Sequence, residues 1–206
     1  MYAQLLLAAS FAIASYQDVK DRAVSDIVWI PAAAGLGLIV YTLYVNSQFL
    51  LLEFEVLKLA LFGGMAFFLV YTGRLGEADL IGMVFFVADP YPAELLLALV
   101  GSLFVIVPHL GYLFATGNAS GSKTIPIDRF LKEQKWIPKA TIVGGVRTEV
   151  SPDVNDAREE VESRKQEGME VEATFGTPTL AYLGIGYIAY VVYLVLFNTS
   201  AFVSLP

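Results

Sequence analysis

The chain has no cysteine, a single histidine and only 13 Lys and Arg among 206 residues. The lack of cysteine excludes disulfide bonds, thiolate zinc or iron–sulfur sites and a cysteine nucleophile. His109 cannot form a histidine metal site alone, and the sequence contains no glycine-rich phosphate loop or basic patch typical of nucleotide or nucleic-acid binding. Any hydrolytic chemistry therefore depends on carboxylates, and we expect no metal, no organic cofactor and no nucleic-acid partner.

Hydrophobic residues make up 56% of the chain and are gathered in long runs. Such runs are typical of membrane-spanning helices. They predict an all-α polytopic protein of the plasma membrane, with six transmembrane helices and a small α+β cytoplasmic insertion. The first span is expected to be retained, because no basic residue precedes it and the residues after it form a poor signal-peptidase site. The expected spans are residues 2–17, 27–45, 56–73, 79–91, 93–115 and 178–197.

The positions of Lys and Arg predict how these spans are oriented. Nine of the 13 lie between the fifth and sixth spans, and three more, Lys20, Arg22 and Arg74, fall on the same side if all six segments cross. Basic residues concentrate in cytoplasmic loops, so we expect the 116–177 loop inside and both termini outside. A short fourth segment that returned without crossing would break this pattern, and we therefore expect it to cross.

The same reasoning divides the chain into three parts. Residues 1–115 form a membrane domain with the first five spans, residues 116–177 a cytoplasmic subdomain, and residues 178–206 the last span and the C-terminus.

Local patterns within the cytoplasmic subdomain predict its elements. Residues 126–132 suit a short amphipathic helix, residues 140–143 and 169–174 suit strands, and residues 156–168 suit a charged helix or a disordered stretch. The glycines of the pairs Gly63-Gly64 and Gly184-x-Gly186 are expected where helices pack closely.

Two carboxylates are predicted at the cytoplasmic membrane face. A helix needs about 20 residues to cross, so Asp18 falls on the last turn of the first span, and Asp79 opens the short fourth span. Charge at the edge of a span is costly, and this placement indicates function. Each residue also has a structural interpretation: Asp18 as an ion pair with Arg22 or Lys20, and Asp79 as the N-cap of the helix that follows it.

The residues around these aspartates resemble two motifs of one enzyme family. Residues 15–22, Ser-Tyr-Gln-Asp-Val-Lys-Asp-Arg, lead to an apolar stretch with proline and resemble the segment after the first span of archaeal preflagellin and type IV prepilin peptidases. Residues 76–79, Gly-Glu-Ala-Asp, resemble the Gly-x-Gly-Asp motif of the same family, which also defines the class of intramembrane proteases containing presenilin and signal peptide peptidase. Ala78 stands where this motif usually has glycine.

The resemblance covers the six-span plan and implies a hydrolase, an aspartic endopeptidase with Asp18 and Asp79 as its catalytic pair. The implied substrates are membrane-anchored preproteins, archaellins or pilin-like proteins, whose short basic leaders (class III signal peptides) are cut at the cytoplasmic face. The methyltransferase activity of bacterial members is not expected, because their cysteine-containing domain is missing here. The supporting motif residues implied by the resemblance are Gly76, Glu77, Ala78 and Arg22.

Several alternatives stay open at this point. Asp21, Asp26 and Glu77 are placed to receive a basic leader, or they simply solvate the rim of the membrane domain. One alternative function is a small proton- or cation-coupled transporter with intramembrane carboxylates. Another is an inactive relative that binds prepilins, which is supported by Ala78 in place of the usual glycine. The sequence does not indicate an oligomeric state.

Overall fold

A computed structural model of the chain describes residues 1–72, 76–88, 92–118, 121–151 and 154–197. The chain divides into two compact units. The first contains Met1–Val19, Val24–Val107 and the described residues from Pro178 on, and the second contains Lys20–Ala23 and Pro108–Thr177.

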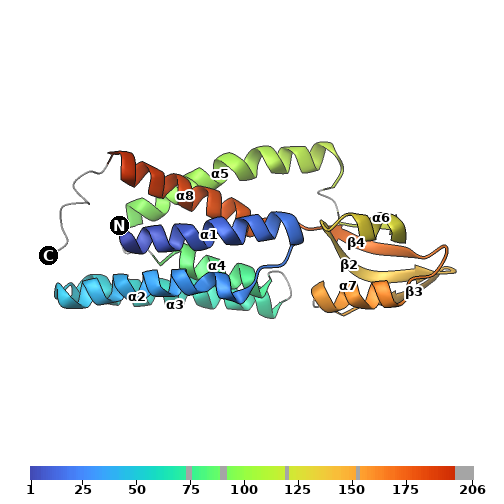
Figure 1. The fold of residues 1–206 in the computed structure, drawn as a ribbon, viewed down its shortest axis with the longest axis horizontal. Helices are drawn as coiled ribbons and strands as arrows, with labels where there is room; N and C mark the ends of the chain where they lie inside the picture. The colour runs from blue at the N-terminus through green and yellow to red at the C-terminus, as the bar shows by residue number, and fades with distance from the viewer. Residues whose placement is uncertain (73–75, 89–91, 119–120, 152–153, 198–206) are drawn as a thin grey trace. The chain divides into compact units, whose positions relative to one another are not determined.

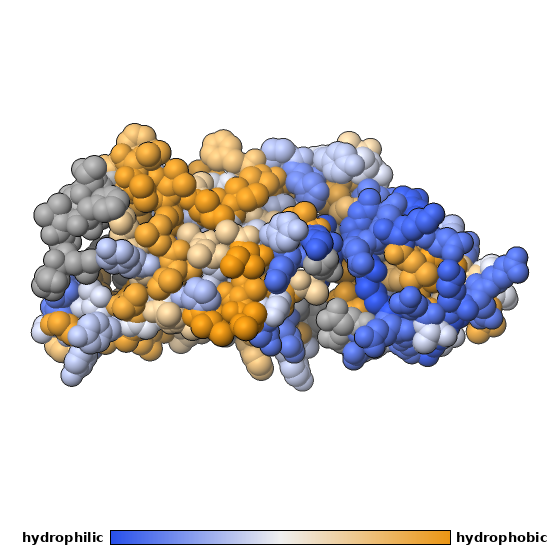
Figure 2. Space-filling view, in the orientation of Figure 1, coloured by the Kyte–Doolittle hydropathy of each residue, from blue (hydrophilic) through white to orange (hydrophobic). Residues whose placement is uncertain are grey.

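The first unit is built from helices (Figure 1). They are α1 (Tyr2–Asp21), the 3-10 helix η1 (Asp26–Trp29), α2 (Ile30–Val45), α3 (Phe49–Tyr71), α4 (Glu77–Phe86), the part of α5 (Pro92–Ala115) up to Val107, and α8 (Thr179–Phe197). Large apolar side chains such as Leu50 and Phe104 face outward, and apolar residues cover most of the visible surface of this unit (Figure 2). Such a surface is stable where the surroundings are lipid rather than water.

Four segments among the described residues are long and apolar enough to cross a membrane. They are Asp26–Val45, Phe49–Tyr71, Leu95–Ala115 and Thr179–Phe197. The other two predicted spans, α1 and α4, are helical but fall outside this set. The fourth predicted span differs most, since α4 ends at Phe86 and its 10 residues reach about 15 Å against a hydrocarbon core of about 30 Å.

The third span begins earlier than predicted. The sequence suggested a start at residue 56, with Lys58 at the span's opening, but α3 begins at Phe49 and includes Lys58 well within the helix. Lys58 is buried, and its Nζ lies 2.7 Å from Oε2 of Glu55, which is also buried one turn earlier. Because the two opposite charges neutralise each other, this polar segment can continue as part of an apolar helix.

Glycines allow close contact between the helices of the first unit. A Cβ on Gly184 of α8 would lie 2.9 Å from the carbonyl oxygen of Phe11 on α1, and one on Gly186 would overlap the carbonyl oxygen of Ala98 on α5. The predicted role of these two glycines is therefore confirmed. Gly64 differs, since among the described residues no heavy atom lies within 4 Å of where its Cβ would be.

The second unit contains a four-stranded antiparallel sheet with the strand order β1-β4-β2-β3. Phe130, Trp136, Val161 and Val171 form its buried core, and hydrophilic residues dominate its visible surface (Figure 2). The helix at 126–132 and the two strands are confirmed, and the charged stretch from 156 begins as a helix. The elements of this unit are β1 (Ser122–Pro126), α6 (Ile127–Lys132), β2 (Trp136–Val143), β3 (Val146–Glu149), α7 (Val154–Ser163) and β4 (Glu170–Phe175).

We expect Lys58→Met to lower the free energy of unfolding by about 3–5 kcal/mol, because it leaves the Glu55 carboxylate buried without its cation. The double change Glu55→Leu/Lys58→Met should recover most of this loss, since it buries no charge. Thermal unfolding in detergent measures both. The control is Glu53→Gln at an exposed position of α3, which should change stability by less than about 0.5 kcal/mol. A Lys58→Met protein as stable as the unmodified one would contradict the prediction.

Candidate active site

The last two turns of α1 are attached to the first turn of α8 by two hydrogen bonds. The backbone N–H of Ala181 donates to Oδ2 of Asp18 at 3.2 Å, and the hydroxyl of Ser15 donates to the carbonyl oxygen of Leu180 at 3.2 Å. The first N–H groups of a helix have no acceptor within the helix, and the buried Asp18 carboxylate supplies one. Asp18 therefore acts as a capping group for α8 although it belongs to another helix.

Asp79 lies in the first turn of α4, three residues after the N-cap, Gly76. Its carboxylate accepts a hydrogen bond from the backbone N–H of Gly76, the arrangement that a capping box makes with its third helical residue. The interpretation of Asp79 as the N-cap itself is therefore wrong. The positive end of the helix dipole favours a carboxylate at this position.

Leu180 connects the two aspartate-bearing helices. Its side chain is buried against α4 at Gly82, where an added Cβ would overlap it. Gly82 lies one turn after Asp79, and Leu180 precedes the residue whose N–H binds Asp18. The first turn of α8 thus contacts α1 on one side and α4 on the other.

Aromatic rings line this contact. Trp29 of η1 is buried, stacks on Phe85 of α4 with ring centroids 5.7 Å apart, and meets Phe11 of α1 edge-on at 5.8 Å. A Cβ on Gly82 would also lie 3.3 Å from the Trp29 ring. The rings therefore form part of the apolar core beside Gly82.

The two aspartates lie on helices that both contact the first turn of α8. Asp79 is partly buried, and the negative charge of Asp18 is close enough to act on its carboxyl group. The two residues come from helices whose sequences are far apart, and only the packing of α1, α8 and α4 brings them near each other. Two carboxyl groups in one poorly hydrated site form a potential acid and base pair.

The other predicted site residues that the structure describes are exposed or only partly buried. Gly76 and Glu77 are exposed at the start of α4, and Ala78 packs partly against the core of the first unit. Asp26 is exposed in the first turn of η1, and the side chain of Asp21 lies outside the described part of the chain.

The backbone of Arg22 has a conformation that ends α1. Its φ of 54° places it in the left-handed region directly after α1, a conformation that commonly ends helices. Sequence analysis singled out Arg22 for its charge and did not anticipate this conformation.

Three site residues were missed: Ser15, Gly82 and Leu180. A signal existed for Ser15, which is a polar residue one turn before Asp18, and for Gly82, which interrupts an apolar helix. The sequence contains no signal for Leu180, because leucine is common in apolar spans.

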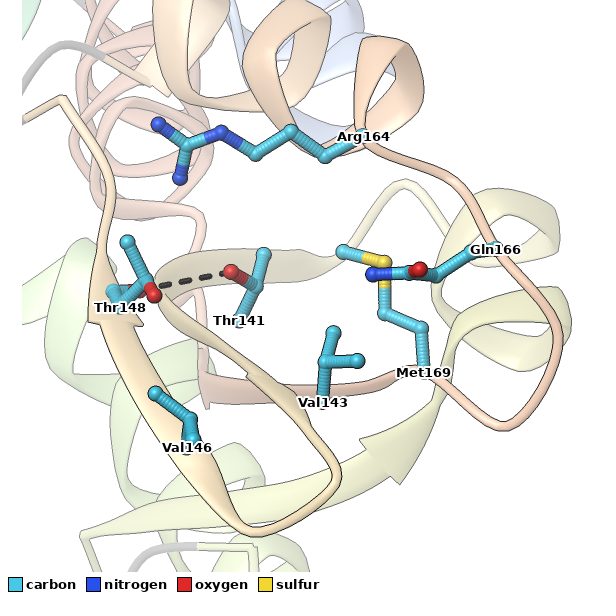
Figure 3. A pocket seen from close by; sticks show the side chains of 7 residues that line it. All are labelled: Thr141, Val143, Val146, Thr148, Arg164, Gln166 and Met169. Carbon is cyan, nitrogen blue, oxygen red and sulfur yellow. Dashed lines mark hydrogen bonds between the residues drawn. The ribbon is translucent and has the colours of Figure 1, made fainter.

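The second unit has a pocket of about 340 Å³ (Figure 3). The hydroxyl of Thr141 donates to the carbonyl oxygen of Thr148 at 3.4 Å, and Arg164 pairs with Glu160. These polar groups already have protein partners, and we assign no chemistry to the pocket. Its lining residues are Thr141, Val143, Val146, Thr148, Arg164, Gln166 and Met169.

No protein-family model, no curated protein and no solved structure matches the chain. Within the described residues, no three His, Asp or Glu side chains are grouped so that they could hold a metal ion.

Substitution of Asp18 can separate its structural role from its chemistry. Asn keeps an oxygen that accepts the Ala181 N–H, and Ala removes it, so we expect Asp18→Ala to be less stable than Asp18→Asn by about 1 kcal/mol. Thermal unfolding of both variants in detergent measures the difference. Asp26→Ala, at an exposed position, is the control and should be nearly neutral. Equal stability of the two Asp18 variants would show that the bond to α8 contributes nothing.

Proposed function

We propose that the protein is a membrane aspartyl endopeptidase that removes short basic leader peptides from archaellin-like or pilin-like preproteins at the cytoplasmic membrane face. The observation that carries this proposal is that the first turn of α8 binds Asp18 at Ala181 and packs through Leu180 against Gly82, one turn after Asp79. Like charges held together do not stabilise a fold, so their proximity calls for a chemical reason. The motif resemblance supplies the substrate class.

The mechanism follows from two carboxyl groups that share one proton. Two carboxylates close together in a poorly hydrated site cannot both ionise readily, so the pair retains one proton. The ionised member takes a proton from water as the water oxygen attacks the scissile carbonyl carbon, and the protonated member gives its proton to the carbonyl oxygen. When the resulting gem-diol collapses, the C–N bond breaks and the aspartate that took the water proton gives it to the leaving amine. The other aspartate takes the proton of one hydroxyl group, which leaves a carboxylic acid product and returns the pair to its starting state.

Six membrane crossings are part of the proposal. Four helices are long and apolar enough to cross, and α1 and α4 would complete the set. α4 is too short to cross lipid alone, but it packs against α3, α8 and α2, and Phe86, Val87 and Ala88 at its end are buried. Backbone that is not covered by lipid can leave the helical conformation within a membrane, and this covering supports a crossing at α4.

The buried Glu55–Lys58 pair in α3 is the observation that favours the alternative of a transporter. Ionisable groups inside a span commonly line an ion path. This pair is already neutralised by mutual contact at 2.7 Å, whereas Asp18 and Asp79 carry like charges. The aspartate pair is therefore the better candidate for chemistry.

Cleavage of an archaellin-type precursor, co-expressed in membranes and followed by its shift on an immunoblot, tests the enzyme. We expect Asp18→Asn and Asp79→Asn each to slow cleavage by at least about 100-fold, because each removes one member of the acid and base pair. Glu53→Gln, an exposed carboxylate on α3, is the matched control and should retain full activity. Cleavage that survives either aspartate change would remove that residue from the pair.

The absence of cysteine allows a direct test of the crossing at α4. Gln48 lies between α2 and α3, Ser163 ends α7, and both are exposed. If α4 crosses, three crossings separate these positions and place them on opposite sides of the membrane. A membrane-impermeant maleimide should then label the single variant Gln48→Cys in intact cells, and Ser163→Cys only after the cells are opened. Labelling from the same side would mean that α4 does not cross.

A further inference from the structure

The first turn of α8 makes a different kind of contact with each aspartate-bearing helix. Toward α1, the carbonyl oxygen of Leu180 accepts a hydrogen bond from the Ser15 hydroxyl, and the backbone N–H of Ala181 donates one to Asp18. Toward α4, the Leu180 side chain fills the space left by the missing side chain of Gly82. The Leu180 side chain therefore lies between the start of α8 and α4, while α1 and α4 also meet directly where the rings of Phe11 and Phe86 pack edge-on at 6.0 Å.

The Leu180 side chain is 1% exposed. A Cβ at position 82 would overlap it, and the Trp29 ring lies close to the same point, so the side chain has little room to move. A buried leucine held in this way transmits a change of shape to its neighbours because protein interiors are densely packed.

We infer that Leu180 is a positioning residue that sets the separation between Asp18 and Asp79. The inference rests on the proposed function only for its effect on catalysis, since the separation itself is a property of the first unit. Leu180 contacts the helices and not the reacting atoms, so it acts through α1 and α4. A shortened side chain lets α4 shift relative to α1, and misplacement of a reacting group by about 1 Å can slow a reaction about 100-fold.

The first measurement is a distance that does not require activity. Val19 beside Asp18 and Glu77 near Asp79 are both exposed, so spin labels on Val19→Cys and Glu77→Cys report the separation of α1 and α4 by pulsed electron paramagnetic resonance. We expect Leu180→Ala to move and broaden the distance distribution. Leu180→Met, which keeps nearly the same volume, should leave it unchanged.

The second measurement is kinetic, on proteins with both aspartates intact. We expect Leu180→Ala to reduce kcat by about 10 to 100-fold with little change in KM, and Leu180→Met to retain most of the activity. The control is Leu194→Ala, which also removes a buried leucine from α8 but lies 14 residues, or about 21 Å, further along the helix. It should lose stability without a change in label distance or kcat.

A compensating pair of substitutions tests the contact itself. Gly82→Ala places a methyl group where Leu180 lies and should shift the label distance, whereas Gly82→Ala/Leu180→Ala gives that methyl group the space that Leu180 vacates. We expect the double variant to lie closer to the unmodified protein than either single variant does.

The outcomes separate the inference from the proposed function. An unchanged distance in Leu180→Ala, or an equal change in Leu194→Ala, would overturn the positioning role. If the unmodified protein cuts no precursor, the proposed function fails, while the label distances still decide whether Leu180 sets the separation.

Discussion

The hydrogen bond from the Ala181 N–H to the Asp18 carboxylate is the interaction on which the rest of the site depends. The first N–H groups of α8 need acceptors, and where they are buried only protein groups can supply them. Asp18 does so, and in doing so it joins the first and last helices of the first unit. The same carboxylate thus holds α1 against α8 and is one of the two aspartates of the candidate site.

Among the described residues of the first unit, Glu55 with Lys58 and Asp18 with Asp79 are two pairs of buried or partly buried ionisable groups, and the contrast between them is informative. Glu55 and Lys58 have opposite charges one turn apart on one helix, so their attraction offsets much of the energy needed to remove them from water. Asp18 and Asp79 have the same charge and come from different helices. Their meeting opposes folding unless a proton is shared, and the helix ends that bind each carboxylate provide the offsetting energy.

The sequence was sufficient to predict what depends on local pattern. Both aspartates could be placed near helix ends from span length alone, and the α6 helix and two strands followed from periodicity. The start of α3 was missed because Glu53, Glu55 and Lys58 resemble a loop unless their pairing one turn apart is recognised. Strand β3 was missed because all four of its residues are exposed and show no alternation. The role of Leu180 could not be predicted from the sequence, since its contact with Gly82 depends on how helices that are distant in sequence pack.

The kinds of contact around Leu180 also indicate which part of the site can adjust. Hydrogen bonds are directional, so the two that join α1 to α8 fix Asp18 against the α8 helix. The contact between Leu180 and Gly82 is apolar, and apolar contacts tolerate small sliding because they lack a preferred direction. α4 is also short and covered by neighbouring helices, so a small shift need not expose its backbone to lipid. Any approach of the two carboxyl groups during a reaction is therefore expected to come from movement of α4, with α1 and α8 as the fixed part.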